Sequence, residues 1–392
     1  MLVTMLDTAK PRPYRVLSLD GGGMRGIYTA AFLERLCGQH AKRNGGKQLD
    51  IGLGFDLIVG TSTGAIVGCA AAVGCPMSEV VSLYRDKGSE IFPHRLKGKA
   101  SAIYGALCGR RFVRSGDLAL REALTKVLGE TSLVEVYRKR EISMSVPTVL
   151  MSEHRAWVFK KTAASGVRDD DYSLVDICMA TTAAPIYRSL AAIDPPGMKG
   201  GPKQVFADGG LWANNPIMVA LTDALAAADE DQPIEIFALG TCPHPEGEHI
   251  TGDGVHRSLL EWWMGAQVAP LAISAQEFAY DNMARLLAGQ LSKTGRSINT
   301  IRFPRNDVPA SMMPFLALDD TRDAATERLI AQAHTDADMT RSACDDPQDQ
   351  TGSRIQALLN AMPEFDPQKA IFSVKTDENR KTNNEQRGER HV

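Results

Sequence analysis

The sequence predicts an α/β fold with a largely parallel central sheet. Short apolar and β-branched runs alternate with segments of helical periodicity, which is typical of strand–helix–strand units. The chain has 392 residues, of which 44% are hydrophobic and 23% are charged, so it contains enough apolar material for a sizeable core. A fold of the α/β class often uses this length as one domain.

The first four predicted elements surround two glycine-rich turns. A strand at 14–19 ends in an aspartate and three glycines, and apolar residues at helical spacing predict a helix over 27–43. A second buried strand is predicted at 55–59. The segment 65–73 is apolar on every side and consists of small residues, so we expect a helix packed inside the protein.

The alternation continues further along the chain. Extended segments are predicted at 142–151, 156–160 and 234–239, with a helix at 174–183 between them. The polar tail at 376–392 cannot bury enough surface to fold, so we expect it to be disordered.

Composition argues against several functions. The formal net charge of −3 disfavours a protein dedicated to binding nucleic-acid polymers. The seven cysteines include no C-x-x-C pair, which favours reduced thiols in a cytoplasmic protein over disulfides or a zinc site. No secretory signal is recognisable. The stretch 57–78 has 22 residues without a charge, but its four glycines and one proline favour strand, turn and helix over a membrane span.

The first glycine-rich turn, DGGGMRG at 20–26, is typical of a loop that holds an anion. Gly21, Gly23 and Gly26 fit the G-x-G-x-x-G fingerprint of dinucleotide-binding loops. Such a module also needs an acidic residue at the end of the next strand, about 20 residues beyond the loop. The next predicted strand begins only at 55 and ends without an acid, so the dinucleotide interpretation is disfavoured.

The second turn, GTSTG at 60–64, is a G-x-S-x-G pentapeptide with a predicted strand before it and a helix after it. In that context the chain turns sharply at Ser62 and lifts its hydroxyl out of the sheet, while Gly60 and Gly64 relieve the crowding. The helix start places amide groups and a positive dipole end beside the hydroxyl, where an oxyanion would form. We therefore predict a nucleophilic serine rather than an idle one.

A nucleophilic serine needs a base, and the sequence offers two kinds. His244 and His154 are the best placed of the eight histidines, but both positions are more typical of surface loops. Asp208 ends a short apolar strand, and Gly209 and Gly210 let the chain turn tightly around it. A carboxylate close to the serine acts as a general base when its surroundings raise its pKa, although D-G-G alone is also an ordinary turn.

In this order, DGGGMRG, GTSTG and DGG at 208–210 resemble the motifs of the patatin-like phospholipases, a family of lipid acyl hydrolases. The segments MATTAAPIY at 179–187 and LGT at 239–241 are similar to further family features. The resemblance is strongest over 14–245. It implies a three-layer α/β/α sandwich with a mostly parallel central sheet and extra C-terminal helices.

The resemblance also implies roles for residues of this chain. Ser62 would be the nucleophile and Asp208 its base, in a dyad without histidine that cleaves fatty-acyl esters of membrane phospholipids through an acyl-enzyme. Arg25 would steady the oxyanion-hole loop or attract a lipid phosphate. No metal or organic cofactor is implied for the hydrolysis. The oxyanion-hole loop would consist of Gly21, Gly22, Gly23 and Arg25.

The implied organisation is one acyl hydrolase domain at 14–375, with a helical C-terminal part at 250–340. It is preceded by an N-terminal extension at 1–13 and followed by the tail at 376–392.

The layout is also similar to a bacterial subgroup, the phospholipase effectors of anti-phage (CBASS) defence, which a cyclic dinucleotide switches on to degrade the cell's own membrane. That similarity implies a cyclic-dinucleotide activator and a cytoplasmic enzyme that acts at the inner face of the membrane, and it leaves a homo-oligomer open. Two alternatives remain, namely a Ser-His-Asp esterase for small esters and a non-catalytic nucleotide-binding module that uses the glycine-rich loop.

Two further segments have no counterpart in these motifs. The segment 85–115 contains eight basic and two acidic residues, which is more typical of a solvated face than of a surface for anionic headgroups or a phosphate-bearing regulator. The segment 259–291 is predicted to be helical. Its apolar spacing favours a core helix over a lid, a membrane-contacting helix or an oligomer seam. The residues at that spacing are Ala275, Ala279, Met283, Leu286 and Leu287.

Overall fold

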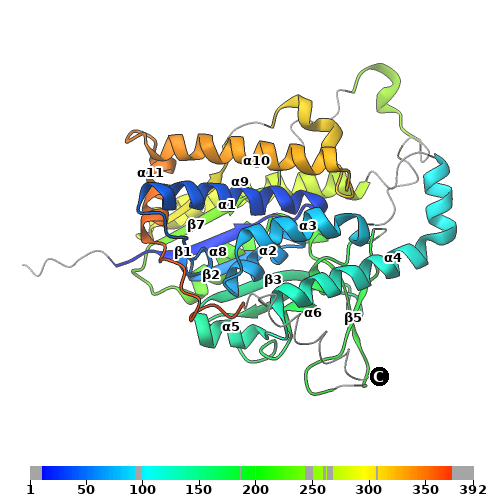
Figure 1. Cartoon of the computed structure of the whole chain (residues 1–392), viewed down its shortest axis with the longest axis horizontal. Helices are drawn as coiled ribbons and strands as arrows, with labels where there is room; N and C mark the ends of the chain where they lie inside the picture. The colour runs from blue at the N-terminus through cyan, green and yellow to red at the C-terminus, as the bar shows by residue number, and fades with distance from the viewer. Residues whose placement is uncertain are drawn as a thin grey trace, which may run out of the picture.

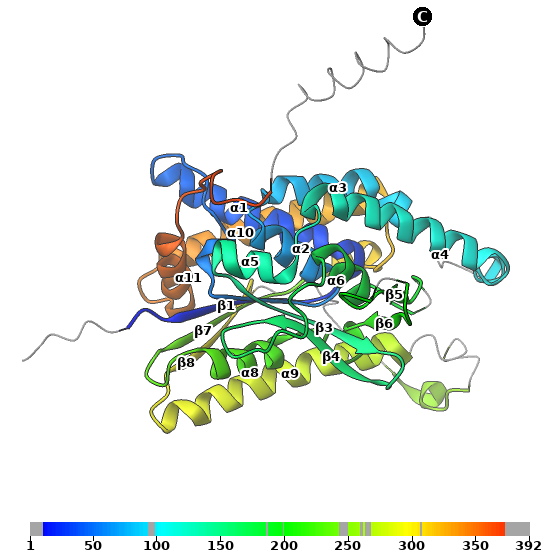
Figure 2. The same cartoon turned by 90° about the horizontal axis from the view of Figure 1, so that it is seen from below.

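A mixed sheet forms the middle of the molecule, and helices cover both of its faces (Figures 1 and 2). The predicted three-layer α/β/α architecture is confirmed. The computed structural model describes residues 11–92, 99–185, 187–198, 200–242, 250–258, 262, 268–305 and 308–372, without the side chains of 99–110 and 269.

The sheet has eight strands in the order β5-β6-β3-β2-β1-β7-β8, with β4 paired to β3. Five adjacent strands, β3, β2, β1, β7 and β8, pair in parallel. Strands β4 and β6 run antiparallel to β3, and β5 runs antiparallel to β6. The strand bounds are β1 Tyr14–Leu19, β2 Leu57–Gly60, β3 Ser143–Leu150, β4 Arg155–Lys161, β5 Ala191–Ile193, β6 Gln204–Asp208, β7 Ile234–Leu239 and β8 Ile298–Phe303.

Helices of the larger core cover one face of the sheet (Figure 2). The small-residue helix α2 is buried along its whole length in this layer, as the sequence predicts. The bounds of these helices are α1 Gly26–Arg43, α2 Thr63–Ala72, α3 Met77–Ile91, α4 Lys99–Leu128, α5 Leu133–Arg140, α6 Leu174–Thr181, α10 Asp323–Cys344 and α11 Gln350–Ala361.

The opposite face of the sheet carries a second, smaller core beneath α7 Gly210–Ala213, α8 Ile217–Ala227 and α9 Val268–Lys293. Short 3-10 turns complete the described structure. They are Gly23–Arg25, Gly52–Gly54, Gly252–Val255 and Ala310–Phe315.

The register of β3 explains how two distant segments meet. β2 pairs with β3 from Ser143 to Ser145, and β6 pairs from Thr148 to Leu150 in the opposite direction. Since β4 occupies the other edge of β3, β2 and β6 share one edge and lie end to end. Their carboxyl ends therefore face each other, and the residues that follow β2 meet the last residue of β6.

The interpretation of the 259–291 segment as a core helix is wrong. Ala284 and Ala288 of α9 are buried, but Met283, Leu286 and Leu287 are exposed. Helix α9 is the outermost element on its side of the sheet, so only its inner side has a neighbour to pack against (Figure 2). Ala275 and Ala279 are exposed for the same reason.

The remaining expectations are partly covered by the structure. Within the described ranges, no helix is long and apolar enough to cross a bilayer. The basic segment falls on α3 and α4, where Arg85 and Lys87 form ion pairs with Glu327 and Glu90. The structure does not describe residues 93–98, the side chains of 99–110 or the tail at 376–392.

Candidate active site

Ser62 lies at the sharp turn between β2 and α2. Its φ of 53° and ψ of −122° fall where non-glycine residues are rare, as expected for a strand-to-helix turn that presents a serine hydroxyl. A Cβ on Gly60 would come within 2.6 Å of the backbone of Gly64, and one on Gly64 would come within 2.4 Å of the Leu19 carbonyl oxygen. A side chain at either flanking position would clash with these backbone atoms, so both positions require glycine.

Asp208 faces Ser62 across the junction of β2 and β6. The Ser62 hydroxyl donates a 2.8 Å hydrogen bond to Asp208 Oδ2, and the Gly210 amide donates to Asp208 Oδ1 at 2.7 Å. Burial raises the pKa of Asp208 to about 6, against the lowering effect of these two hydrogen bonds and of the Arg188 charge. A carboxyl group with that pKa is suited to accept and return a proton near neutral pH.

The structure contains a second buried Ser–Asp pair, Ser145 and Asp223, which differs from the Ser62–Asp208 pair in two respects. The Ser145 hydroxyl donates to Asp223 at 2.7 Å, but Ser145 is fully buried within β3. Lys160 donates to the other Asp223 oxygen at 2.9 Å and neutralises its charge. The Ser145 pair lacks a sharp turn, and its carboxylate is hydrogen-bonded to a lysine, so its geometry is structural.

The glycine loop after β1 lies directly against Ser62. A Cβ on Gly21 would come within 3.3 Å of Ser62 Cβ, and one on Gly22 within 2.3 Å of Thr241 Oγ1. The Gly21 amide donates to the Asn214 carbonyl at 2.9 Å. Within the described part of the chain, no hydrogen bond engages the amides of Gly22 and Gly23. These two N–H groups are available to an oxyanion on a Ser62 adduct.

Arg25 is buried beneath this loop. Its guanidinium donates to the Gly22 carbonyl at 3.4 Å and to the Cys242 carbonyl at 3.2 Å. These contacts fit the expectation that Arg25 steadies the loop.

Four positions around the site were missed by sequence reasoning. Thr181 accepts a 2.9 Å hydrogen bond from the Ser62 amide, and Asn214 Nδ2 donates to the Gly21 carbonyl at 3.2 Å. Thr181 belongs to MATTAAPIY and Asn214 follows D-G-G closely, so both lie beside recognised motifs. Glu277 accepts from Asn214 Nδ2, and Arg188 lies near Asp208, but neither has a local sequence signal.

None of the described histidines partners Ser62. His154 and His256 are exposed, and His40 contacts Asn44 and Arg341. His244 lies outside the described residues. The hydrogen bond of the Ser62 hydroxyl goes to a carboxylate.

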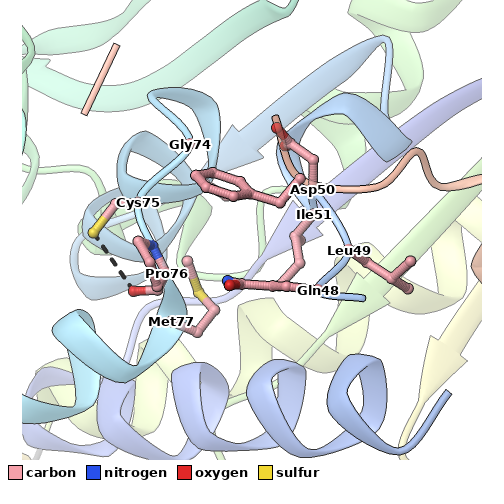
Figure 3. A pocket seen from close by; sticks show the side chains of 11 residues that line it. Gln48, Leu49, Asp50, Ile51, Gly74, Cys75, Pro76 and Met77 are labelled. Atoms are coloured by element: carbon pink, nitrogen blue, oxygen red, sulfur yellow. Dashed lines mark hydrogen bonds between the residues drawn. The ribbon is translucent and has the colours of Figure 1, made fainter. Parts of the chain in front are cut away.

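A pocket of this molecule lies at the other end of α2. It is bounded by Gln48–Ile51, by Gly74–Met77 and by Phe365 (Figure 3). Ser62 caps the N-terminus of α2, whereas the pocket is lined by Ala71 near the C-terminus of that helix and by the turn that follows it. The pocket contains none of the predicted site residues.

Arg188 should tune the pKa of Asp208. Its side chain is 4% exposed and donates to Asp117 at 2.6 Å, and its charge lowers the pKa of Asp208. We expect Arg188→Met to raise the pKa of Asp208 further, so that kcat/KM falls several-fold at pH 6 and recovers toward wild type at pH 8. Arg188→Lys should restore much of the wild-type profile.

The matched control is Arg121→Met, which removes the exposed Arg121–Asp176 ion pair between α4 and α6. The charge of Arg121 is not among those that shift the pKa of Asp208. Identical pH profiles for the Arg188 and Arg121 variants would contradict the assignment.

A three-layer α/β/α protein that carries a serine at a strained strand-to-helix turn, with a buried carboxylate as its partner, belongs to the class of α/β serine hydrolases. The family model for patatin-like phospholipases matches residues 17–221. The chain belongs to the patatin-like phospholipase family, and it is a hydrolase that acts on lipid esters.

Several curated relatives are named for an activator. The chain is similar to the cGAMP-activated phospholipase of Escherichia coli, with 29% identity over 82% of this chain and 88% of the relative. It is similar to the cGAMP-activated phospholipase of Pseudomonas aeruginosa, with 32% identity over 70% of this chain and 76% of the relative. A cUMP-AMP-activated phospholipase of Escherichia coli is 25% identical over 70% of this chain and 77% of that relative.

Proposed function

We propose that this chain is a phospholipase A-type enzyme that uses Ser62 as nucleophile and Asp208 as general base, and that a cyclic dinucleotide switches it on. The observation that carries the dyad is the 2.8 Å hydrogen bond from the Ser62 hydroxyl to a buried carboxylate. The cyclic dinucleotides for which these relatives are named support the switch. The reaction would take place at the cytoplasmic face of the membrane, as part of anti-phage defence.

The first half of the reaction forms an acyl-enzyme. Ser62 Oγ attacks the ester carbonyl of a phospholipid while Asp208 Oδ2 takes the hydroxyl proton. The amides of Gly22 and Gly23 stabilise the oxyanion of the tetrahedral intermediate. Loss of one such donor typically costs on the order of 2.7–4 kcal/mol of activation free energy. Asp208 then returns the proton to the departing lysophospholipid oxygen, and the Ser62 ester remains.

The second half frees the enzyme. Asp208 takes a proton from a water molecule that attacks the Ser62 ester, and the same amides stabilise the second tetrahedral intermediate. Its collapse releases a fatty acid and returns the proton to Ser62 Oγ. Neither half needs a metal ion, because the proton moves between Ser62, Asp208 and the leaving group or water.

The test is mass spectrometry of lipids from purified bacterial membranes, incubated with wild type or with Ser62→Ala in the presence and absence of a panel of cyclic dinucleotides. We expect wild type to release fatty acids and lysophospholipids, with one dinucleotide raising the rate, and Ser62→Ala to release neither. Equal rates with every dinucleotide and without any would overturn the switch. No release under any condition would overturn the phospholipase assignment.

A further inference from the structure

Helix α9 has an inner edge that is hydrogen-bonded to Asn214 and Asn215, and Asn214 in turn contacts the glycine loop. The Asn214 amide donates to Gln276 Oε1 at 3.1 Å, and Asn215 Nδ2 donates to the Glu277 carbonyl at 3.1 Å. Asn214 in turn holds Gly21 through its side-chain amide and its backbone carbonyl. The middle of α9 is therefore fastened to the loop that lies against Ser62.

The outer face of the same helix is apolar. Phe278 follows Glu277 directly and is 79% exposed. Further large apolar side chains are exposed along the helix on both sides of it, with exposed alanines between them. The large ones are Val268, Leu271, Met283, Leu286 and Leu287.

The acidic residues of α9 lie on its inner side, and its basic residues lie on its outer side. Its two acidic residues, Glu277 and Asp281, are bonded to Asn214 and to Arg302. Its two basic residues, Arg285 and Lys293, are exposed. The described outer face is thus apolar and cationic, which is the pattern of helices that lie in the interface of an anionic bilayer.

We propose that the outer face of α9 is the surface with which this protein docks on an anionic lipid bilayer. This inference rests on the proposed function, because docking there brings the phospholipid substrate beside the helix that is fastened to the glycine loop. A second copy of the chain fits the face less well. In a two-fold contact along α9, the cations of each copy would meet no acidic partner on the outer face of the other.

The test separates binding from hydrolysis by using Ser62→Ala protein for the binding arm. Partition onto vesicles of phosphatidylglycerol and phosphatidylethanolamine, and onto neutral phosphatidylcholine vesicles, is measured by co-sedimentation with the cyclic-dinucleotide panel present. The α9 variant is Phe278→Asp with Leu286→Asp. The matched control is Leu118→Asp with Val167→Asp, which places the same charges at exposed apolar positions outside α9.

We expect the α9 variant to partition onto anionic vesicles at least about tenfold more weakly than the control. Neutral vesicles should bind the parent protein less than anionic ones. In the hydrolysis arm, with Ser62 intact, the α9 variant should lose cleavage of vesicle lipid and keep cleavage of a water-soluble short-chain ester. Circular dichroism and thermal unfolding show whether the variants are folded.

Equal partition of the α9 variant and the control onto anionic vesicles would overturn the docking surface. If the α9 variant then also has a smaller sedimentation coefficient than the control, the face is a contact between copies of the chain. If wild type cleaves neither substrate, the proposed function fails, but the binding arm still decides the docking surface.

Discussion

Ser62→Ala and Asp208→Asn are each expected to lower kcat/KM for phospholipid hydrolysis by roughly four orders of magnitude or more. Without Ser62 there is no acyl acceptor. In the proposed mechanism only the Asp208 carboxylate takes the proton from the hydroxyl, which donates its hydrogen bond to that carboxylate at 2.8 Å. Because the proposed mechanism places both groups in one proton transfer, the double variant should be little worse than either single variant. Initial rates of fatty-acid release measure all three.

The controls come from the same chain. Ser145→Ala removes the hydroxyl of the structural Ser–Asp pair and should leave the rate near wild type, provided the variant is folded. His154→Ala, His244→Ala and His256→Ala should each retain substantial activity. A loss of several orders of magnitude in one of the histidine variants would replace the dyad with a Ser-His-Asp triad.

The raised pKa of Asp208 predicts an acid limb in the activity profile. Asp208 must be ionised to take the Ser62 proton as proposed, and burial moves its pKa from 3.8 to about 6. We expect kcat/KM to reach half its plateau near pH 6 and to fall about tenfold per pH unit below that. The measurement is a pH series on a water-soluble ester. A half-point near pH 4 would contradict the environment described for Asp208.

The same shift makes ionised Asp208 costly for stability. Between pH 3.8 and about 6 the folded protein holds the Asp208 proton and the unfolded chain does not, so stability falls as pH rises through this window. Above it the cost reaches its full value, about 3 kcal/mol for a shift of this size. Asp208→Asn should therefore be inactive yet more stable than wild type at pH 8.

Denaturant unfolding of both proteins at pH 4 and pH 8 tests this prediction. The gain in free energy of unfolding for Asp208→Asn should be largest at pH 8 and should shrink toward pH 4. Groups that titrate alike in both proteins cancel in the comparison. A difference that does not change with pH would show that the carboxyl is not desolvated as the fold implies.

Local sequence patterns were enough to predict those parts of the site that depend only on a few neighbouring residues. The strand at 14–19, the helix at 65–73 and the turn at Ser62 lie close to their predicted positions, because alternation, small-residue content and paired glycines act over a few residues. Asp208 also ends its strand as predicted. The family resemblance rested on these same motifs.

Contacts between distant segments had no such signal. Arg188 lies in the loop between α6 and β5, and Glu277 lies on α9. They affect Asp208 and Asn214 only because tertiary packing brings these segments together. The predicted core helix at 259–291 failed for a related reason. Periodicity shows that a helix has an apolar face, but the number of layers around the sheet decides whether anything covers that face.

The sequence by itself determined the fold class, the sharp turn at Ser62 and the carboxyl-terminal aspartate of β6, since each depends on neighbouring residues. Only the tertiary structure decided that the two groups meet. They are 146 residues apart, and they touch because β2 and β6 share one edge of β3 with opposite directions. The same packing removes water from Asp208 and raises its pKa, which converts an ordinary D-G-G turn into a candidate base.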